Sequence, residues 1–572
     1  MTGDVVIAPA WADRRNPQVR MVCVPYDRPQ YPASAGHAVS NHHGGPHMEE
    51  FDVIISGYGP TGISAASLIA RMGHSVAVFE RWPTMYGLPR LCSIDGESCR
   101  IVQAAGDVDQ ALADHSDVKW YHLVDGEGNV LIDVNFEKEK RVSGFYNRKS
   151  MYQPDVERAM DEAGRERGVQ VFQGYELKAF EQDADGVTVT VEKNMRRYEG
   201  PQEDPKQYRA KYLIGADGAN SIVRKVMKPE MDDYGFREGF LSVDVMRKGD
   251  YQFASETSTS ICDPKRPISV IPIGNNRMRF EFLIDPDEDN TELLTPDVGY
   301  HFLESAWGIT KDDVEIYRQV LYPFEAKVMH NWRQGRAFLA GDAAHQMPPF
   351  QGQGACSGMR DSINLAWKLD LVLRGLADED LLDLYTEERR PHVTKVTVDT
   401  VEIGKVACTR DEKVIDELSA FLKSGGELPP PPTMPNLDFG ILHRASGEVD
   451  RPAGLLGPQG PVEKDGVTGR FDDVVGWGFQ LIVAGTDPLA DLSDEHREFL
   501  AQINCVAANV GDGGDVKPLD AEYMEYFATH GVMGVLVRPD YYVFAGIRSL
   551  DELPAIIDDL RGQLKIKALA PA

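Results

Sequence analysis

The first stretch with a clear hydrophobic pattern lies near the beginning of the chain. A buried-strand run at 51–56 is followed by a glycine turn, a helical stretch at 60–72 and a second strand at 75–80. The order of strand, helix and strand is typical of a parallel α/β sheet. We therefore expect a Rossmann-like unit to begin at residue 51.

The middle of the chain has the two-residue periodicity of strands. Between about 235 and 330, short apolar segments such as 240–246, 268–273 and 278–284 are separated by Asp, Pro and Asn turns. This pattern predicts a mostly antiparallel sheet, inserted into the first unit, that binds the substrate.

A long helix is predicted from 355 to 374, directly after a glycine-rich turn. Apolar residues recur there at the three-and-four spacing that buries one helical face. These residues are Met359, Ile363, Ala366, Leu369 and Leu373.

A stiff extended segment separates the last part of the chain from the rest. Two glycines at 425–426 precede four consecutive prolines at 429–432, which no helix interior tolerates. We place one unit at 51–425, a Pro-rich linker at 426–445 and a small α/β domain at 446–572. The elements predicted in this domain are strands at 478–483, 534–537 and 541–545 and a helix at 550–560.

Residues 1–48 have neither periodicity nor the apolar core of a signal peptide, which predicts a flexible extension. His42, His43 and His47 lie at its end, but the glycines and proline between them fix no ligand geometry. We expect no metal site.

The composition narrows the class of protein. A length of 572 residues predicts two or three packed units, and no apolar run is long enough to cross a bilayer. A net charge of −30 argues against nucleic acid as a partner. Seven scattered cysteines without a C-x-x-C pair fit free thiols in the cytoplasm, and not a disulfide framework or a zinc site.

The glycine turn matches G-x-G-x-x-G in the context that a dinucleotide site requires. Gly57 permits the tight turn, Gly59 lets a pyrophosphate approach, and Gly62 allows close packing of helix and strand. Pro60 and Thr61 open the helix, whose free N–H groups attract an anion.

The second strand ends at the residue that would bind the ribose. Glu80, followed by Arg81, suits a ribose 2′-hydroxyl and repels a 2′-phosphate. The turn therefore predicts a non-phosphorylated adenosine, as in NAD or FAD, and does not by itself separate the two. A ligand-free glycine turn is the alternative.

Two later segments have a carboxylate at the end of an apolar strand. In 212–221 this residue is Asp217, and in 336–345 it is Asp342. The second segment continues into a glycine-rich turn before the long helix. An Asp at a strand end can accept hydrogen bonds from polyol hydroxyls.

The three segments, in this order and at these separations, resemble those of the class A flavoprotein monooxygenases, which include para-hydroxybenzoate hydroxylase and phenol hydroxylase. The resemblance covers about 51–400, and the run 341–365 looks most like that of the hydroxyphenylpropionate hydroxylases. It implies an FAD domain with an inserted substrate sheet, a small aromatic substrate, O2, and NADH or NADPH as co-substrate. It also allows a homodimer.

The resemblance assigns cofactor roles to several residues. Asp342 would bind the ribityl chain of FAD, and Asp217 would serve both FAD and the nicotinamide. Arg90 and Gln153 match cofactor-contacting positions, although Arg90 could be a surface charge and Gln153 a helix cap. The turn before the long helix would face the pyrophosphate and flavin through Pro349, Gly352, Gln353 and Gly354.

In this family the cofactor performs the oxygen chemistry, through a flavin C4a-hydroperoxide. The ring attacks more readily once its hydroxyl is deprotonated, so a general base is useful. The segment 94–100 resembles the phenol hydroxylase segment whose Asp lies beside the substrate, which makes Asp95 the candidate base. A helix N-cap is an equal alternative for Asp95. His345 is a second candidate by chemical type, although its position favours a structural hydrogen bond.

The domain at 446–572 resembles the thioredoxin-like appendage of phenol hydroxylase, with 535–540 as the best match. It lacks C-x-x-C, which predicts a stabilising or interface role instead of redox exchange. Two other functions stay open. One is an FAD-dependent oxidoreductase that acts on a non-aromatic compound, and the other is a flavin-binding sensor that has lost turnover.

Overall fold

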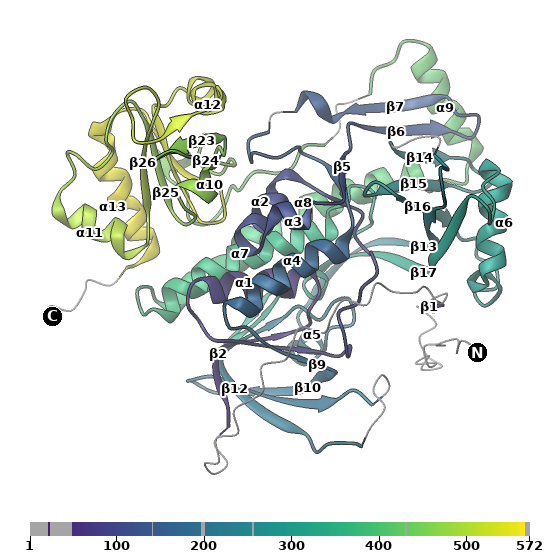
Figure 1. Cartoon of the computed structure of the whole chain (residues 1–572), viewed down its shortest axis with the longest axis horizontal. Helices are drawn as coiled ribbons and strands as arrows, with labels where there is room; N and C mark the ends of the chain where they lie inside the picture. The colour runs from purple at the N-terminus through teal and green to yellow at the C-terminus, as the bar shows by residue number, and fades with distance from the viewer. Residues whose placement is uncertain are drawn as a thin grey trace.

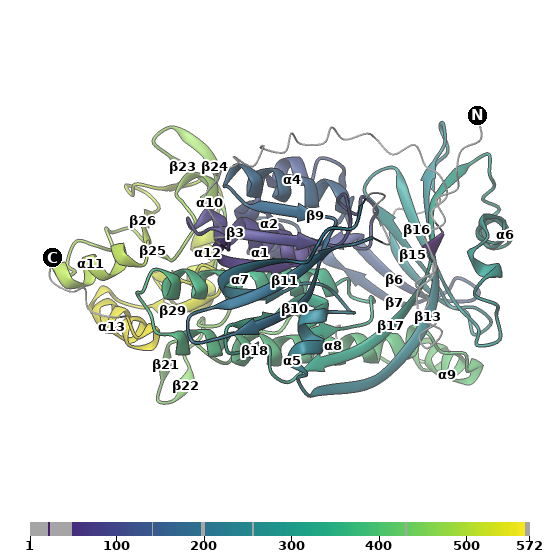
Figure 2. The ribbon, with the colours of Figure 1, turned by 90° about the horizontal axis from the view of Figure 1, so that it is seen from below.

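The structure is a computed structural model that describes residues 21–22, 48–139, 141–195, 201–253, 257–428 and 432–566. Figures 1 and 2 show the C-terminal part, in yellow and light green, at one end of the molecule and a large antiparallel sheet at the other end. A helical layer and a central sheet lie between them. Of the predicted N-terminal extension and its three histidines, nearly all lies outside the described residues.

The central sheet carries the three sequence segments singled out above. Its strand order is β10-β11-β12-β2-β3-β9, with β19 beside β12 and β18 beside β19. The strands are β2 (Glu50–Ser56), β3 (Val76–Glu80), β9 (Gln170–Gln173), β10 (Tyr175–Gln182), β11 (Val187–Lys193), β12 (Lys206–Gly215), β18 (Arg333–Gln334) and β19 (Ala337–Leu339). The predicted strands at 51–56 and 75–80 are confirmed.

The direction of these strands decides where the segments meet. β2 is parallel to both β3 and β12, and β12 is parallel to β19. Parallel neighbours end at the same sheet edge, where ligands of α/β proteins bind. The residues that follow β2, β12 and β19 are therefore brought together although they lie far apart in the sequence.

Helices cover this sheet. They are α1 (Pro60–Arg71), α2 (Gly96–Ala105), α3 (Val108–Ala111), α4 (Gln153–Glu166), α5 (Ile222–Met227), α7 (Gly354–Leu373) and α8 (Leu384–Ala407). The predicted helices at 60–72 and 355–374 are confirmed as α1 and α7. α7 packs against α1, α2 and α8, so it is buried on several faces and not only on the predicted one.

The second large sheet has the order β1-β17-β13-β16-β15-β14-β6-β7, with β20 beside β17. Its strands are β1 (Met21–Val22), β6 (Trp120–Asp125), β7 (Val130–Asn135), β13 (Met231–Arg247), β14 (Ser258–Cys262), β15 (Ile268–Ile273), β16 (Arg277–Leu283), β17 (Val314–Met329) and β20 (His345–Gln346). One face is apolar and packs against α6 (Pro296–Trp307), whose Leu303 is fully buried. We call the opposite face the cleft face.

This sheet extends beyond the predicted insertion. β6 and β7 come from residues before 235, and β6 pairs with β14 in parallel. β1 pairs with β17 at the other edge. Such pairings join segments that are distant in sequence, so no local pattern reveals them.

The C-terminal part has a four-stranded mixed sheet with the order β26-β25-β28-β29. β25 is parallel to β26 and antiparallel to β28. The strands are β25 (Gln480–Ala484), β26 (Val506–Val510), β28 (Gly534–Val537) and β29 (Val543–Ile547), and the helices are α10 (Phe471–Val474), α11 (Asp494–Gln502), α12 (Glu522–His530) and α13 (Leu553–Leu564).

The remaining elements of the described residues are one helix, several short strands and five 3-10 turns. They are α9 (Glu412–Lys423), the strands β4 (Ser93–Ile94), β5 (His115–Asp117), β8 (Lys149–Met151), β21 (Arg444–Ala445), β22 (Glu448–Val449), β23 (Pro461–Lys464), β24 (Val467–Arg470) and β27 (Lys517–Pro518), and the 3-10 turns η1 (Phe136–Lys138), η2 (Glu292–Leu294), η3 (Gly341–Ala343), η4 (Glu379–Asp383) and η5 (Leu550–Glu552). Among the described residues no helix is both long and apolar enough to span a bilayer. The six described cysteines are all free thiols.

A buried ion cluster attaches the C-terminal part to the central helices. Arg538 donates to both carboxylate oxygens of Glu388 on α8, at 2.9 and 2.7 Å, and also pairs with Asp540. Lys368 on α7 lies 2.8 Å from Glu388, and Asn364 donates to Asp540 at 2.8 Å. Burial alone would raise the pKa of Glu388, but the charges of Arg538 and Lys368 hold this pKa well below its usual range.

We expect Glu388→Gln to destabilise the protein by about 3–5 kcal/mol, because it leaves the buried Lys368 without its counter-charge and Arg538 with Asp540 alone. Urea unfolding followed by tryptophan fluorescence measures this change. The matched control is Glu387→Gln, which alters an exposed neighbour on the same helix and should change stability by less than about 0.5 kcal/mol. Equal midpoints for the two variants would contradict the assigned role of the cluster.

Candidate functional site

The two large sheets enclose a single continuous cleft with a volume of about 3080 Å³. A pocket for one small ligand is usually about 300–1,000 Å³, so this cleft has room for a large cofactor and a substrate. Its wall includes the carboxyl edge of the central sheet and residues of β13, β16 and β17. We call the parts next to these two walls the cofactor half and the substrate half.

The glycine turn at 57–62 lies on the wall of the cofactor half. Gly57 has φ +98°, and a side chain on it would overlap the backbone of Ala216. A side chain on Gly62 would overlap the carbonyl of Gly57. Gly59 has ordinary dihedrals and no atom within 4 Å of an added Cβ, so the space in front of it is open to a ligand.

The helix that follows the turn begins without a side-chain cap. Gly59 is its N-cap and Pro60 its first residue, so its first backbone N–H groups receive no side-chain cap bond. Thr61 packs against α7, and its carbonyl accepts a 2.8 Å hydrogen bond from the Ser362 hydroxyl. An uncapped helix start at the edge of a cleft is a suitable site for a phosphate.

Glu80 lies where the motif requires it, at the end of β3 on the wall of the cleft. Its two carboxylate oxygens accept backbone hydrogen bonds from Tyr58 at 2.8 Å and from Trp82 at 2.9 Å. A carboxylate oxygen accepts more than one hydrogen bond, so Glu80 keeps capacity for ribose hydroxyls. Arg81 also lines the cleft.

Asp217 and Asp342 reach the cleft from the ends of β12 and β19, which are parallel neighbours. Asp217 accepts a 2.7 Å hydrogen bond from the Ile222 N–H, while its Oδ1 is buried without a partner among the described residues. Burial raises the pKa of both carboxyl groups. Arg224 connects the two segments by donating to the carbonyls of Asp342 and Ala343 at 3.1 and 3.0 Å.

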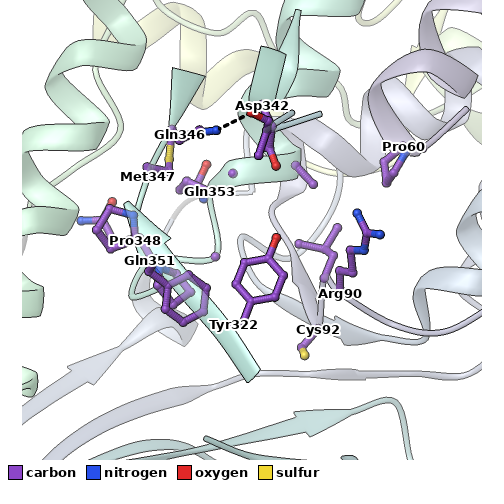
Figure 3. A pocket seen from close by; sticks show the side chains of 18 of the residues that line it. Pro60, Arg90, Cys92, Tyr322, Asp342, Gln346, Met347, Pro348, Gln351 and Gln353 are labelled. Carbon is purple, nitrogen blue, oxygen red and sulfur yellow. Dashed lines mark hydrogen bonds between the residues drawn. The ribbon is translucent and has the colours of Figure 1, made fainter. Parts of the chain in front are cut away.

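The loop at 88–92 forms the opposite lip of the cofactor half. Figure 3 shows Arg90, Tyr322 and Asp342 around the same cavity, with Cys92 beside them. The Arg90 guanidinium lies 4.4 Å from the centre of the Tyr86 ring. The Arg90 side chain is exposed and lines the cleft at this lip.

Gln153 is buried and positions that loop. Its side-chain carbonyl accepts hydrogen bonds from the N–H groups of Arg90 and Leu91, both at 2.7 Å, and its amide donates to Glu157 at 2.6 Å. Gln153 lies in the first turn of α4 and provides no cap for that helix, whose N-cap is Tyr152. The alternative of a helix-capping side chain is therefore wrong.

The turn before α7 closes the end of the cofactor half. Gly352 has φ +66° and donates to the carbonyl of Pro349 at 2.8 Å, which makes the turn tight. α7 begins at Gly354 with no side-chain cap at Gln353. The Gln353 side chain is instead held by Arg360, at 2.9 Å. A second uncapped helix start therefore faces the cleft.

Asp95 is a helix cap, which confirms the alternative given above. It is the N-cap of α2 and accepts a 2.8 Å hydrogen bond from the Ser98 N–H. Its other oxygen pairs with Arg360 at 2.5 Å. Although burial alone would raise the pKa of Asp95, the Arg360 charge and the Ser98 bonds hold it below the usual range. Asp95 also lines the cleft, but this environment makes its carboxylate a weak base.

His345 has the structural role that its position favoured. Its Nε2 lies 2.6 Å from Asp361, and the side chain is buried. Asp361 also accepts from the Gly341 N–H at 3.0 Å and from Arg389 at 2.9 Å. His345 thus belongs to the network that holds the Asp342 segment against α7.

Several residues of the cleft carried no signal in the sequence. They are Cys92 in the loop, Tyr322 on β17, and the polar residues of the cleft face, Ser242, Arg279, Glu281 and Arg318. Alternation along the strands predicts that one face is polar, but only the packing of α6 shows which face is outside. The only sequence signal for these cleft residues was a polar residue at every second position of a strand.

The residues present fit FAD. The open space before Gly59, two uncapped helix starts and Asp217 Oδ1, which has no partner among the described residues, all line the same cleft. These groups suit a pyrophosphate and polyol hydroxyls.

Comparisons of the sequence with known proteins agree with this geometry. The model of the FAD binding domain family matches residues 50–400, and that of the HcaD C-terminal domain family matches residues 454–563. A probable NADH-specific resorcinol 4-hydroxylase of Rhodococcus jostii (strain RHA1) is 34% identical over 91% of this chain and 95% of its own length. A 3-(3-hydroxy-phenyl)propionate/3-hydroxycinnamic acid hydroxylase of Comamonas testosteroni is 28% identical over 89% and 96%.

Solved structures share the fold. The flavin-dependent monooxygenase PieE, determined with FAD and substrate, superposes with a TM-score of 0.73 at 19% identity over 90% of this chain and 99% of its own. Aklavinone-11 hydroxylase, determined with FAD and aklavinone, gives a TM-score of 0.71 at 23% identity over 91% and 100%. At these identities the likeness establishes the fold alone.

We expect Gly59→Ala to reduce the affinity for FAD at least tenfold, about 1.4 kcal/mol, because the added methyl group occupies the open space. The stability of the FAD-free protein should change by less than about 0.5 kcal/mol, since nothing in the fold contacts that methyl group. Titration by flavin fluorescence and thermal unfolding of the FAD-free protein measure the two quantities.

The matched variant is Gly62→Ala, in which the same methyl group overlaps the carbonyl of Gly57. This overpacking should lower the stability of the FAD-free protein by roughly 1–3 kcal/mol as well as weaken FAD binding. If Gly59→Ala binds FAD like the unaltered protein, the space before Gly59 is not the pyrophosphate site.

Proposed function

Because this chain belongs to the FAD-binding family of aromatic flavoprotein monooxygenases, we propose that it hydroxylates a small phenolic ring with O2 and with NADH as reductant. In each turnover one oxygen atom enters the ring and the other leaves as water. NADH supplies the two electrons. The net reaction consumes the phenol, O2, NADH and one solvent proton, and releases the hydroxylated ring, NAD+ and water. The observation that carries this proposal is the meeting of Gly57, Asp217 and Asp342 at one sheet edge, opposite a polar wall.

The choice of substrate and reductant is supported by the curated relatives. The Rhodococcus jostii protein is named for NADH and resorcinol, and the Comamonas testosteroni protein for 3-(3-hydroxy-phenyl)propionate and 3-hydroxycinnamic acid. These compounds share a ring that carries a hydroxyl group with a second substituent in the meta position. We infer a meta-substituted phenol for this chain.

The cofactor half would hold FAD through hydrogen-bond donors at one part of the cofactor and carboxylate acceptors at another. The turn at 57–62 and the start of α1 would receive the pyrophosphate, with Glu80 and Arg81 beside the adenosine end. Asp342 would bind the ribityl hydroxyls, and Asp217 would face both the cofactor and the reduced nicotinamide. Bound FAD would supply the electron transfer and oxygen activation that protein side chains cannot provide.

The flavin end of the cofactor would lie between the loop at 88–92 and the turn at 349–354. Gln153 fixes the first of these segments through Arg90, and Arg360 fixes the second through Gln353. These two fixed segments would hold the ring of the substrate against the flavin and restrict the access of water.

We further propose that the C-terminal part is a thioredoxin-like domain with a stabilising role. Its mixed sheet, in the order β26-β25-β28-β29, supports this topology, and the lack of a C-x-x-C pair excludes dithiol exchange. Leu455 and Tyr542 of this part line the cleft, so it would also help to close the cleft. Free thiols are consistent with a place in the cytoplasm, and a homodimer would leave the cleft complete within each subunit.

We expect a yellow protein whose NADH oxidation accelerates with a meta-substituted phenol and yields a product with one added oxygen atom. Oxygen uptake with NADH or NADPH across resorcinol, 3-(3-hydroxyphenyl)propionate and phenol, followed by mass analysis of the products, checks this. The matched control is 3-phenylpropionate, which lacks the ring hydroxyl and should not be hydroxylated.

Two outcomes would favour the other functions. Flavin reduction by NADH without substrate-stimulated oxygen uptake by any phenol would indicate a sensor. Turnover of a non-aromatic compound, with no oxygen inserted into the phenols, would indicate a different oxidoreductase.

A further inference from the structure

The cleft face of the second sheet carries an unusual set of charges. Side chains alternate between the two faces of a strand, and the face opposite α6 carries a row of polar residues on β13, β16 and β17, next to the apolar Val320. Register places Ser242 beside Glu281, and Asp244 beside both Arg279 and Arg318. All five are less than one tenth exposed. A buried polar row of this kind requires partners or a ligand.

Three members of the row pair with one another. The two oxygens of Asp244 accept from Arg279 at 2.6 and 3.0 Å, and one of them also accepts from Arg318 at 3.0 Å. Arg279 in addition donates to the carbonyls of Pro89 and Arg90 at 2.8 and 2.7 Å. The polar row therefore lies directly against the loop at the lip of the cofactor half.

Glu281 differs because its carboxylate is only partly engaged. It lines the cleft, is 3% exposed, and accepts one 3.2 Å hydrogen bond, from the Ser242 hydroxyl to Oε1. Arg279 is 3.8 Å from the same oxygen, too far for a hydrogen bond. Oε2 has no hydrogen-bond partner among the residues that the structure describes. Burial raises the pKa of Glu281, although Arg279 opposes this effect.

The other buried carboxylates on the wall come from different elements. Asp95 and Glu97 belong to α2, and both pair with Arg360, at 2.5 and 2.6 Å. Glu157 on α4 is bonded to Gln153 at 2.6 Å in the cofactor half. Among the buried carboxylates that line the cleft within the described chain, Glu281 is the one on the substrate sheet.

We propose that Glu281 accepts the proton of the phenolic hydroxyl of the substrate. The O–H bond of the phenol breaks, its electron pair stays on the oxygen as phenolate, and the proton forms a neutral carboxylic acid on Glu281. The proton returns to the hydroxylated product or to water after turnover. The phenolate makes the ring electron-rich where the oxygen atom enters. This assignment rests on the proposed function and replaces Asp95 as the base.

The two residues beside Glu281 would act as positioning groups. The Ser242 hydroxyl orients the carboxylate, and Arg318 has a buried Nε without a hydrogen-bond partner among the described residues. Arg318 lines the cleft, so this N–H is available to a second oxygen of the substrate. A base and a separate donor on one wall would suit a ring that carries two oxygen-bearing substituents.

The charges around Glu281 come from several elements. Arg279 lies on its own strand, Asp244 on β13 and Arg318 on β17, and all three act on it electrostatically. The neutral thiols of Cys92 in the loop and Cys408 after α8 also lie near enough to interact with it. The two arginines stay charged, and Asp244 is hydrogen-bonded to both of them. Glu281 has no such pairing, and burial raises its pKa.

The test compares Glu281→Gln with the matched control Glu304→Gln. Glu304 is exposed on α6, behind the same sheet. For a phenol with a pKa of about 10 at pH 7, kcat/KM of Glu281→Gln should fall by about 100-fold or more, and that of the control should not change. The acidic limb of the pH profile, where protonated Glu281 cannot accept a proton, should disappear only in Glu281→Gln.

A polyfluorinated phenol that is already ionised at pH 7 separates catalysis from structure. With this substrate Glu281→Gln should regain nearly the rate of the unaltered protein, because no proton has to be removed. A purely structural defect would reduce both rates equally. Ser242→Ala supplies a second variant, and should shift the acidic limb to higher pH because it removes a hydrogen bond that favours the ionised carboxylate.

Asp95→Asn tests the competing base. It should lower stability, since it loses the Arg360 ion pair, but keep the acidic limb. The proposal is overturned if Glu281→Gln keeps that limb, if the ionised phenol restores nothing, or if Asp95→Asn loses the limb. Failure of the proposed function is distinct, because the unaltered protein would then hydroxylate no phenol at all.

Discussion

The structure depends on one constraint, which is that helix α7 is buried on several faces and yet carries charged residues. Arg360, Asp361 and Lys368 are each at most 2% exposed, and a charge at such a depth is tolerated only when it is paired. Each finds its partner on a different element. Arg360 pairs with Asp95 and Glu97 of α2, Asp361 with His345 and Arg389, and Lys368 with Glu388. One helix thereby fixes the glycine-rich turn at its N-terminus and the C-terminal domain near its other end.

These pairings also divide the carboxylates of the cleft by their chemistry. The Arg360 charge and the Ser98 N–H hold Asp95 ionised and make it a poor proton acceptor. Glu97 pairs with the same arginine, but burial raises its pKa. A buried carboxylate with few partners has a raised pKa and accepts a proton more readily, which describes Glu281. Asp217 and Asp342 have raised pKa values in the cofactor half, where hydroxyl groups of a ligand could supply the missing hydrogen bonds. The pKa values of the carboxylates in the cleft therefore depend on both their burial and their partners.

The sequence was most informative where the chemistry is local. The turn at 57–62 was recognisable because strand, glycines, helix and Glu80 lie within about thirty residues, and each glycine has its own steric reason. The helix at 355–374 was equally clear from its apolar spacing, although the spacing did not reveal that its polar face is buried too. For Asp95 the sequence left two roles, since a helix cap and a base require the same residue type. The structure shows the cap through the Ser98 N–H, and Arg360, which lies 265 residues away, pairs with the other oxygen of Asp95.

By itself, then, the sequence determined that this protein has a dinucleotide-type turn, two further strand-end carboxylates and a separate C-terminal unit without a dithiol. Only the tertiary structure decided that the three segments share one sheet edge, because this follows from the parallel pairing of β2, β12 and β19. Only the tertiary structure placed β6 and β7 in the sheet of β13, β16 and β17 and turned Glu281 toward the cleft. Strand alternation defines two faces but does not say which one is covered, and that choice was made by the packing of α6.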